Sequence, residues 1–201
     1  MIVDLNGFSG MVAAAEEVGD LIAQFTRDSL VGAIQEIEME GGEVVGFMGD
    51  AILGILPDGD SAVKACFGIA KDLDHMCEYI SSEQAGCKEI WAFAPGGPSI
   101  KIAIEFGRMD VSTIKSRLLG EHRLLIGSPI NYAARISKAG EGNRCIIGQA
   151  AAKKEFGNYQ LSGPHSISGK PGEPDYEHYF LDLSDIWIEG PRSPGEETYW
   201  G

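Results

Sequence analysis

Along two long segments of this chain, apolar residues recur every three or four positions, as they do on one face of an α-helix. The first segment covers about residues 9–40, with Ser9 as a suitable N-cap and Gly41-Gly42 as a stop signal. The second segment covers residues 61 to about 80. Both are expected to be helices that bury one face against the rest of the molecule.

Between and after these helices, short apolar runs and alternating apolar and charged residues predict β-strands. Two apolar runs on either side of Met48-Gly49-Asp50 indicate a hairpin. Residues 110–127 are expected to form a second hairpin or arm, and residues 129–138 a helix with Ser128 as its N-cap. The expected strands are residues 2–3, 43–47, 51–56, 101–107, 144–147, 159–167 and 177–181, with a short helix from Gln149.

The order of these elements is β-α-β-β-α-β, followed by a helix, a strand and trailing elements. This is the ferredoxin-like order, an α/β (more strictly α+β) architecture with a mainly antiparallel sheet and its helices on one face. We expect one domain over residues 1–182. Residues 183–201, which are rich in Gly, Pro and Glu, are expected to form a C-terminal tail.

Composition narrows the range of functions. The 201 residues are 44% apolar, enough for one ordinary core, and contain neither a signal peptide nor an apolar run long enough to span a membrane. Four cysteines without metal-ligand spacing favour a reducing cytoplasm. A net charge of −14 argues against nucleic acid or an anionic membrane as the main partner. It permits a triphosphate if metal ions supply the positive charge.

Asp4 and Asp50 are the first candidates for chemistry, because each follows an apolar run and lies beside a turn. Carboxylates at the ends of neighbouring strands can clamp divalent cations, and a two-metal clamp serves phosphoryl transfer. Gly7 would let backbone N–H groups approach an anion at the start of the following helix. Taken singly, each aspartate is better explained as ordinary turn chemistry.

A second group of candidates could bind a sugar and phosphates. Asn131 and Arg135 lie four residues apart on an expected helix, so their side chains share one face and could grip a ribose and a phosphate. Lys170, in the turn Gly169-Lys170-Pro171-Gly172, could meet a terminal phosphate. A solvated helix face and a solvated lysine explain the same residues without any ligand.

Together and in this order, these segments resemble the class III nucleotidyl cyclases, the catalytic domain of adenylate and guanylate cyclases. The resemblance is collinear over roughly residues 1–182, and its most specific part is the Asn-x-Ala-Ala-Arg helix after a glycine turn. The segments that carry it are Val3–Ser9, Gly46–Leu53, Ile100–Gly107 and Gly127–Arg135.

The resemblance implies that Asp4 and Asp50 hold two Mg²⁺ or Mn²⁺ ions, with the carbonyl oxygen of Leu5 as a further ligand. A nucleoside triphosphate would be the substrate, and no protein general base is required. The backbone that would cradle its outer phosphates belongs to Asn6, Gly7, Phe8 and Ser9.

The other half of the implied site comes from the Asn/Arg helix. Asn131 would orient the ribose, while Arg135 and Lys170 would stabilise charge on the phosphates. In this family the aspartates and the Asn/Arg helix of one site come from different subunits. A homodimer with two interfacial sites is therefore expected.

The residues that read the base in purine cyclases are missing. The Lys or Glu four positions before the second aspartate is Gly46 here, and the polar residue three positions before the glycine of the Asn/Arg segment is Leu124. With Phe47, these positions form the expected base pocket. A pocket selects a purine when its polar side chains would lose their hydrogen bonds on binding any other base. A pocket without such side chains cannot select a purine in this way.

This combination resembles the bacterial pyrimidine cyclases of phage-defence systems. Those proteins make cyclic UMP or cyclic CMP, which a separate effector protein reads, and cyclic UMP is the product favoured here. Two alternatives stay open: a purine cyclase that reads its base with other groups, and a catalytically inactive domain that binds a nucleotide or only dimerises. A further departure from the family is the short first strand before Asp4.

Overall fold

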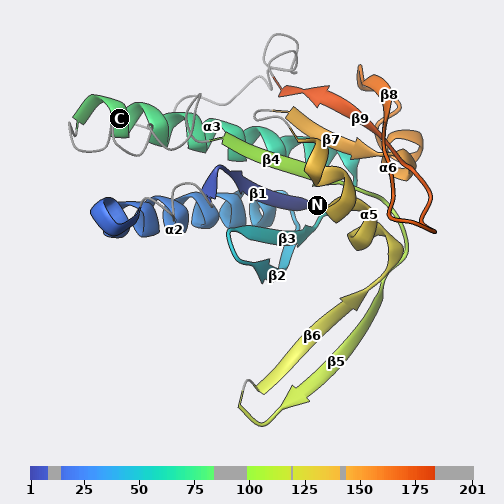
Figure 1. Cartoon of the computed structure of the whole chain (residues 1–201), viewed down its shortest axis with the longest axis horizontal. Helices are drawn as coiled ribbons and strands as arrows, with labels where there is room; N and C mark the ends of the chain where they lie inside the picture. The colour runs from blue at the N-terminus through green and yellow to red at the C-terminus, as the bar shows by residue number, and fades with distance from the viewer. Residues whose placement is uncertain (9–14, 84–98, 119, 141–143, 184–201) are drawn as a thin grey trace.

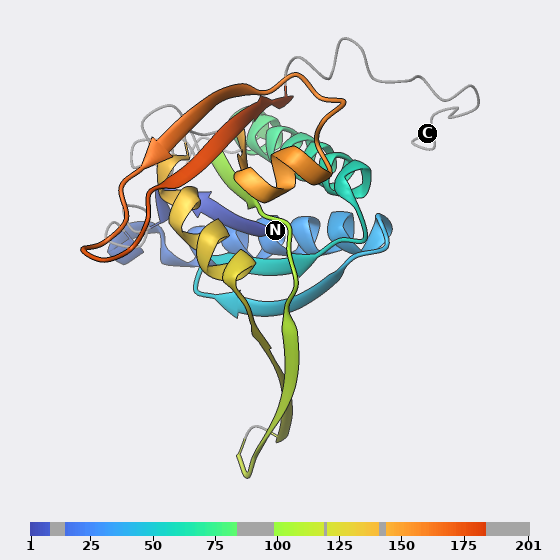
Figure 2. The same ribbon diagram turned by 90° about the vertical axis from the view of Figure 1, so that its right-hand side faces the viewer.

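The computed structural model describes residues 1–8, 15–83, 99–118, 120–140 and 144–183. Its centre is a seven-stranded sheet, with two long helices covering one face and a shorter helix on the other. A two-stranded hairpin projects away from this body (Figure 1). The view turned by 90° shows the same hairpin as a narrow arm (Figure 2).

The main sheet has the strand order β2-β3-β1-β4-β7-β9-β8. Its neighbouring strands are antiparallel, except that β4 and β7 are parallel. The mainly antiparallel, ferredoxin-like core predicted from the sequence is confirmed. The strands are β1 (Ile2–Asn6), β2 (Glu43–Met48), β3 (Ala51–Ile55), β4 (Ser99–Ile104), β7 (Arg144–Gly148), β8 (Ser162–Ile167) and β9 (Tyr176–Asp182).

The two long helices are α2 (Ala15–Met39) and α3 (Gly59–Glu83), and their apolar faces bury the main core against the sheet. Short helix α6 (Gln149–Lys154) joins the same core. Fully buried side chains such as Ile37, Ile52 and Ile69 each contribute roughly 1.5–3 kcal/mol through burial. Gly41, at φ 75°, ends α2 as predicted, in a conformation that favours glycine.

Helix α5 (Ser128–Ile136) packs on the opposite face of the sheet, so the expectation of helices on one face only was wrong. Ala133 and Ile136, three positions apart, contact the sheet in a second core cluster. That cluster includes Ala51 and Ala103, whose small side chains let the helix approach closely. The N-cap of α5 is Gly127 and not Ser128, and no side chain caps the helix.

The arm consists of β5 (Asp110–Ser116) and β6 (Gly120–Ile126), as the sequence indicated. Several apolar side chains on it are exposed: Val111, Ile114, Leu118, Leu124 and Ile126. Halfway along β6, Arg123 forms an ion pair with Glu43 on β2. This contact ties the arm to the edge of the main sheet.

Some expectations fall outside the described residues, namely Ser9 as an N-cap and the tail beyond residue 183. Strand β1 continues past Asp4 to Asn6, because its later residues pair with β4. Among the described helices, none combines the length and apolar character that crossing a membrane requires.

Candidate functional site

Asp4, on β1, and Asp50, in the turn between β2 and β3, lie close enough together for their charges to interact. Asp4 pairs with Ala51 across β1 and β3, and the N–H of Leu5 lies 3.5 Å from the carbonyl oxygen of Asp50. Burial raises the pKa of Asp4, and the charge of Asp50 raises it further, so the two carboxyl groups repel each other. Strand alternation places Asp4 on the same face as Ile2, which packs in the cluster beneath α5.

This donor set fits a hard divalent cation. Carboxylate and carbonyl oxygens are the ligands that Mg²⁺ and Mn²⁺ prefer, and a bound cation would relieve the repulsion between the two acids. In the part of the chain that the structure describes, no cluster of three or more His, Cys, Asp or Glu side chains could hold a metal. The remaining ligands would therefore be backbone oxygens such as that of Leu5, substrate oxygens or water.

Lys101 is a neighbour of Asp4 that sequence patterning did not reveal. It stands directly opposite Asp4 in the β1–β4 register, and its charge lowers the pKa of Asp4 against the two raising effects. Gly140 leaves room for this side chain, because a Cβ there would lie 2.9 Å from Lys101 Cγ and Cδ. The acidic pair thus has a fixed cation beside it.

The turn after β1, where phosphate-binding backbone is predicted, is anchored at both ends. Gly7 adopts φ 82°, a left-handed conformation that suits glycine. The side-chain amide of Asn6 donates to Ser99 Oγ at 3.1 Å, which holds the end of β1 against β4. Phe8 packs against the main core and fixes the far end of the turn. Ser9 lies outside the described residues.

Helix α5 presents the second group of predicted residues. Asn131 is exposed and Arg135 is half-buried, one turn further along the same helix face. Tyr132 anchors the helix to β9 by donating its hydroxyl to the carbonyl oxygen of Glu177 at 2.8 Å. The Tyr132 ring also contacts the Tyr176 ring edge to face, with 5.0 Å between centroids.

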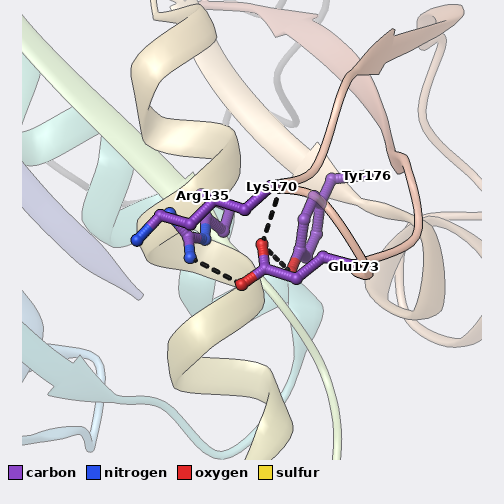
Figure 3. A network of polar contacts seen from close by, with 4 residues as sticks. All are labelled: Arg135, Lys170, Glu173 and Tyr176. Atoms are coloured by element: carbon purple, nitrogen blue, oxygen red, sulfur yellow. Dashed lines mark hydrogen bonds and ion pairs between the residues drawn. The ribbon is translucent and has the colours of Figure 1, made fainter.

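Arg135 and Lys170 are brought together by Glu173, another residue that sequence reasoning missed (Figure 3). Arg135 Nη2 donates to Glu173 Oε1 at 2.9 Å, and the backbone N–H of Lys170 donates to Glu173 Oε2 at 3.1 Å. Tyr176 Oη also donates to Oε2, at 3.3 Å. Sequence spacing gives no signal for this pairing, because Glu173 is 38 positions from Arg135.

The three positions of the expected base pocket lie on two elements. Gly46 and Phe47 are on β2, with Phe47 65% exposed, and Leu124 is on β6, 41% exposed. The ion pair between Arg123, halfway along β6, and Glu43 links these two strands. A Cβ at Gly46 would lie 4.0 Å from Leu53 Cβ, an ordinary contact. Packing alone therefore does not require glycine at this position.

The sequence matches no protein-family model and no curated protein. Solved structures do match. The adenylyl cyclase CyaB from P. aeruginosa has a TM-score of 0.64 at 16% identity, covering 90% of this chain and 90% of that chain. The guanylyl cyclase Cya2 has a TM-score of 0.62 at 17% identity, covering 90% of this chain and 88% of that chain. An adenylate cyclase from Trypanosoma brucei has a TM-score of 0.67 at 14% identity, covering 90% of this chain and 85% of that chain.

These similarities establish the fold of the chain, which is that of the class III nucleotidyl cyclase domain. They extend across nearly the whole of this chain and most of each matched chain. The helices, the sheet and the projecting arm are therefore parts of one known architecture.

Proposed function

We propose that this protein is a nucleotidyl cyclase, which converts a nucleoside triphosphate to a 3′,5′-cyclic nucleoside monophosphate and pyrophosphate. The observation that carries the proposal is the closeness of Asp4, within β1, to Asp50, in the turn between β2 and β3, in a chain with the cyclase fold. An acidic pair at that place has a clear use in phosphoryl transfer, and the predicted ribose and phosphate residues accompany it.

The two aspartates would hold Mg²⁺ or Mn²⁺, with the Leu5 carbonyl oxygen as a further ligand. Bound ions of this kind lower the pKa of the attacking 3′-hydroxyl and neutralise charge on the phosphates. The turn from Asn6 to Ser9 offers backbone N–H groups to the outer phosphates, and Gly7 allows the close approach.

The residues of α5 and the β8–β9 loop act on the other side of the substrate. Asn131 orients the ribose so that its 3′-oxygen faces the α-phosphorus. Arg135 and Lys170 stabilise the charge that develops as pyrophosphate leaves. These assignments rest on the family resemblance and on Glu173, which pairs with the Arg135 guanidinium and accepts from the backbone N–H of Lys170.

A homodimer would complete each site, with the aspartates of one subunit facing the Asn131 and Arg135 helix of the other. The exposed apolar side chains of the arm support such an assembly, because apolar surface of this extent on a projecting element commonly marks an interface. The same reasoning applies to Phe47 and Met48 on edge strand β2.

The substrate is a pyrimidine nucleotide, with UTP to cyclic UMP favoured over CTP to cyclic CMP. Gly46 and Leu124 carry no polar group with which to read a purine, although the position of Gly46 has room for a side chain. The resemblance to phage-defence cyclases further suggests that the product is a second messenger in antiviral defence, read by a separate effector protein.

The decisive experiment supplies each of the four nucleoside triphosphates with Mn²⁺ to a preparation shown to be dimeric, and resolves the products by mass spectrometry. We expect a cyclic mononucleotide and pyrophosphate from UTP or CTP. Asp50→Ala should lower turnover by on the order of a thousandfold or more while keeping the circular dichroism spectrum. A dimeric wild-type protein that consumes no triphosphate would refute the enzyme proposal.

A purine cyclase is the second candidate, favoured by the matched solved structures, which are adenylyl and guanylyl cyclases. It would read its base with backbone groups or with residues other than Gly46 and Leu124. The same assay separates the two candidates, because ATP or GTP would then be the preferred substrate.

A further inference from the structure

We propose that Glu173 is a positioning residue that fixes the Arg135 guanidinium in the orientation needed to meet the phosphates. The expected effect on turnover rests on the proposed function. The immobilisation of the Arg135 guanidinium by Glu173 does not depend on it and can be tested separately.

The two oxygens of the Glu173 carboxylate have different partners. Oε2 accepts from the backbone N–H of Lys170 in the same loop at 3.1 Å and from Tyr176 Oη, at the start of β9, at 3.3 Å. Oε1 accepts from Arg135 Nη2 at 2.9 Å. The carboxylate is therefore anchored on one side and presents its other oxygen to the helix.

The loop around Glu173 is itself tightly turned. The N–H of Glu173 donates to the carbonyl oxygen of Lys170 at 2.8 Å, and Gly172 adopts φ 90°. A side chain would be strained at that φ, so glycine suits the turn. The turn places the Lys170 backbone and the Glu173 carboxylate together, and Figure 3 shows the Lys170 side chain directed toward the same side of α5 as the guanidinium.

The anchor extends into the body of the protein. Tyr176 donates to Glu173 and packs its ring against Tyr132, one helical turn before Arg135. Tyr132 in turn donates to the Glu177 carbonyl oxygen on β9. Glu173 is thus held by Tyr176 of β9, which itself packs on Tyr132 of α5. The carboxylate therefore has a defined position relative to Arg135.

A fixed arginine is useful in catalysis. A free arginine side chain samples many rotamers, and ordering it during the reaction would raise the barrier. An arginine has five N–H donors, and Nη2 alone is engaged by Glu173 among the described residues, so the guanidinium can bind a phosphate while it stays paired. Hydrogen bonds from the Lys170 N–H first, and then the Arg135 charge, hold the pKa of Glu173 below its usual value. The carboxylate therefore stays ionised near neutral pH.

The opposing interpretation is that Glu173 occupies the phosphate position and must be displaced by substrate. The two interpretations predict opposite effects of removing the carboxylate. A positioning residue is required for turnover, whereas a competing occupant restrains it.

The test compares Glu173→Ala with Glu173→Gln, and uses Asp175→Ala in the same loop as the matched control. A Gln side chain keeps only one of the two accepting oxygens, so it can accept either from Arg135 or from the Lys170 N–H and the Tyr176 hydroxyl, but not from both. We expect Glu173→Ala to lower kcat by on the order of ten- to a hundredfold with little change in KM. Glu173→Gln should recover only part of that loss, and Asp175→Ala should match the wild type. Wild-type kcat in Glu173→Ala overturns the inference, and a raised kcat supports the competing occupant.

A second measurement does not depend on cyclase activity. In ¹⁵N-arginine-labelled protein, the heteronuclear NOE of the Arg135 Nε–H group, assigned with Arg135→Lys, reports its fast motion. We expect a rigid signal in the wild type, a mobile one in Glu173→Ala and an intermediate one in Glu173→Gln. An equally rigid signal in Glu173→Ala overturns the inference. If no triphosphate is consumed, the proposed function fails and this comparison still decides whether Glu173 fixes Arg135.

Discussion

Lys101 stands directly opposite Asp4 across strands β1 and β4, so the acidic pair has a cation as its cross-strand neighbour. The electrostatic effect is visible in Asp4, whose pKa is raised by burial and by Asp50 and lowered by Lys101. The local charge at the proposed metal site therefore depends on Lys101 as well as on the two carboxylates.

Removing the Lys101 charge should strengthen the binding of divalent cations. Because a positive neighbour repels a metal ion, Lys101→Met is expected to tighten Mn²⁺ binding by roughly two- to fivefold at low salt. Calorimetric titration with Mn²⁺ measures the effect. The control is Lys154→Met, at an exposed position on α6. Added salt should shrink the difference. Weaker Mn²⁺ binding in Lys101→Met would show that Lys101 acts by holding Asp4 in place.

Mixing two inactive variants tests whether the site is shared between subunits. Asp50→Ala and Arg135→Ala each disable both sites of a homodimer, but a mixed dimer has one site with neither change. Random reassociation should restore about a quarter of wild-type activity, because half of the dimers are mixed and each has one intact site. Cyclic nucleotide formed after mixing, against each variant alone, is the measurement. If mixing restores nothing, the two groups of residues act within one subunit.

Introducing polar residues at Gly46 and Leu124, the two positions that read the base in purine cyclases, should change the base selectivity. Gly46→Lys with Leu124→Asp gives the base pocket the polar pair seen in adenylate cyclases, and the space at Gly46 and the exposure of Leu124 permit both changes. We expect kcat/KM for ATP relative to UTP to rise by about tenfold or more. Gly46→Lys with Leu118→Asp, at the exposed end of the arm, is the matched control. Equal ratios in the two double variants would contradict the assignment of Leu124 to the base pocket.

The stability of the protein should fall in mild acid because of His178. This side chain is 2% exposed on β9, and burial lowers its pKa below the ordinary value of about 6.5, with nearby His165 adding to the effect. Below that pH the unfolded chain binds a proton that the folded chain resists, so the free energy of unfolding decreases as pH falls. Above that pH, His178 is neutral in both the folded and the unfolded chain, so its contribution to the free energy of unfolding does not change with pH.

Urea denaturation between about pH 5 and pH 8 measures this dependence. His178→Gln should flatten the decrease in the acidic range, whatever its effect on stability at pH 8. His75→Gln, at an exposed position on α3, should keep the wild-type slope. An unchanged slope in His178→Gln would exclude His178 as the titrating group.

Sequence periodicity was sufficient for the elements whose signals are local. The helix that ends at Gly41, the hairpin around Asp50 and the arm each have a repeating pattern or turn residues within one short window. Asp4 and Asp50 were expected at the ends of neighbouring strands. Strand β3 does pair with β1, but Asp4 lies inside β1 and not at its end.

The features that were missed depend on contacts between distant segments. The apolar residues Ala133 and Ile136 indicate that α5 has a buried side, but they do not say which face of the sheet it covers. Lys101 faces Asp4 because of the β1–β4 register, and Glu173 faces Arg135 because the β8–β9 loop folds back over α5. Register and loop placement are set by the whole fold, so short-range patterns cannot reveal them.

The arm and α5 lie in the same connection, the one that links the parallel strands β4 and β7. One residue, Gly127, separates the last arm residue from the first residue of the helix that carries Arg135. A Cβ there would lie only 3.0 Å from the Arg108 carbonyl oxygen, so the junction is tightly packed as well as short. In the proposed homodimer, a partner bound to the arm would therefore hold a segment that lies one residue away from the helix that carries Arg135. Dimerisation would then restrict the position of that helix as well as complete the site.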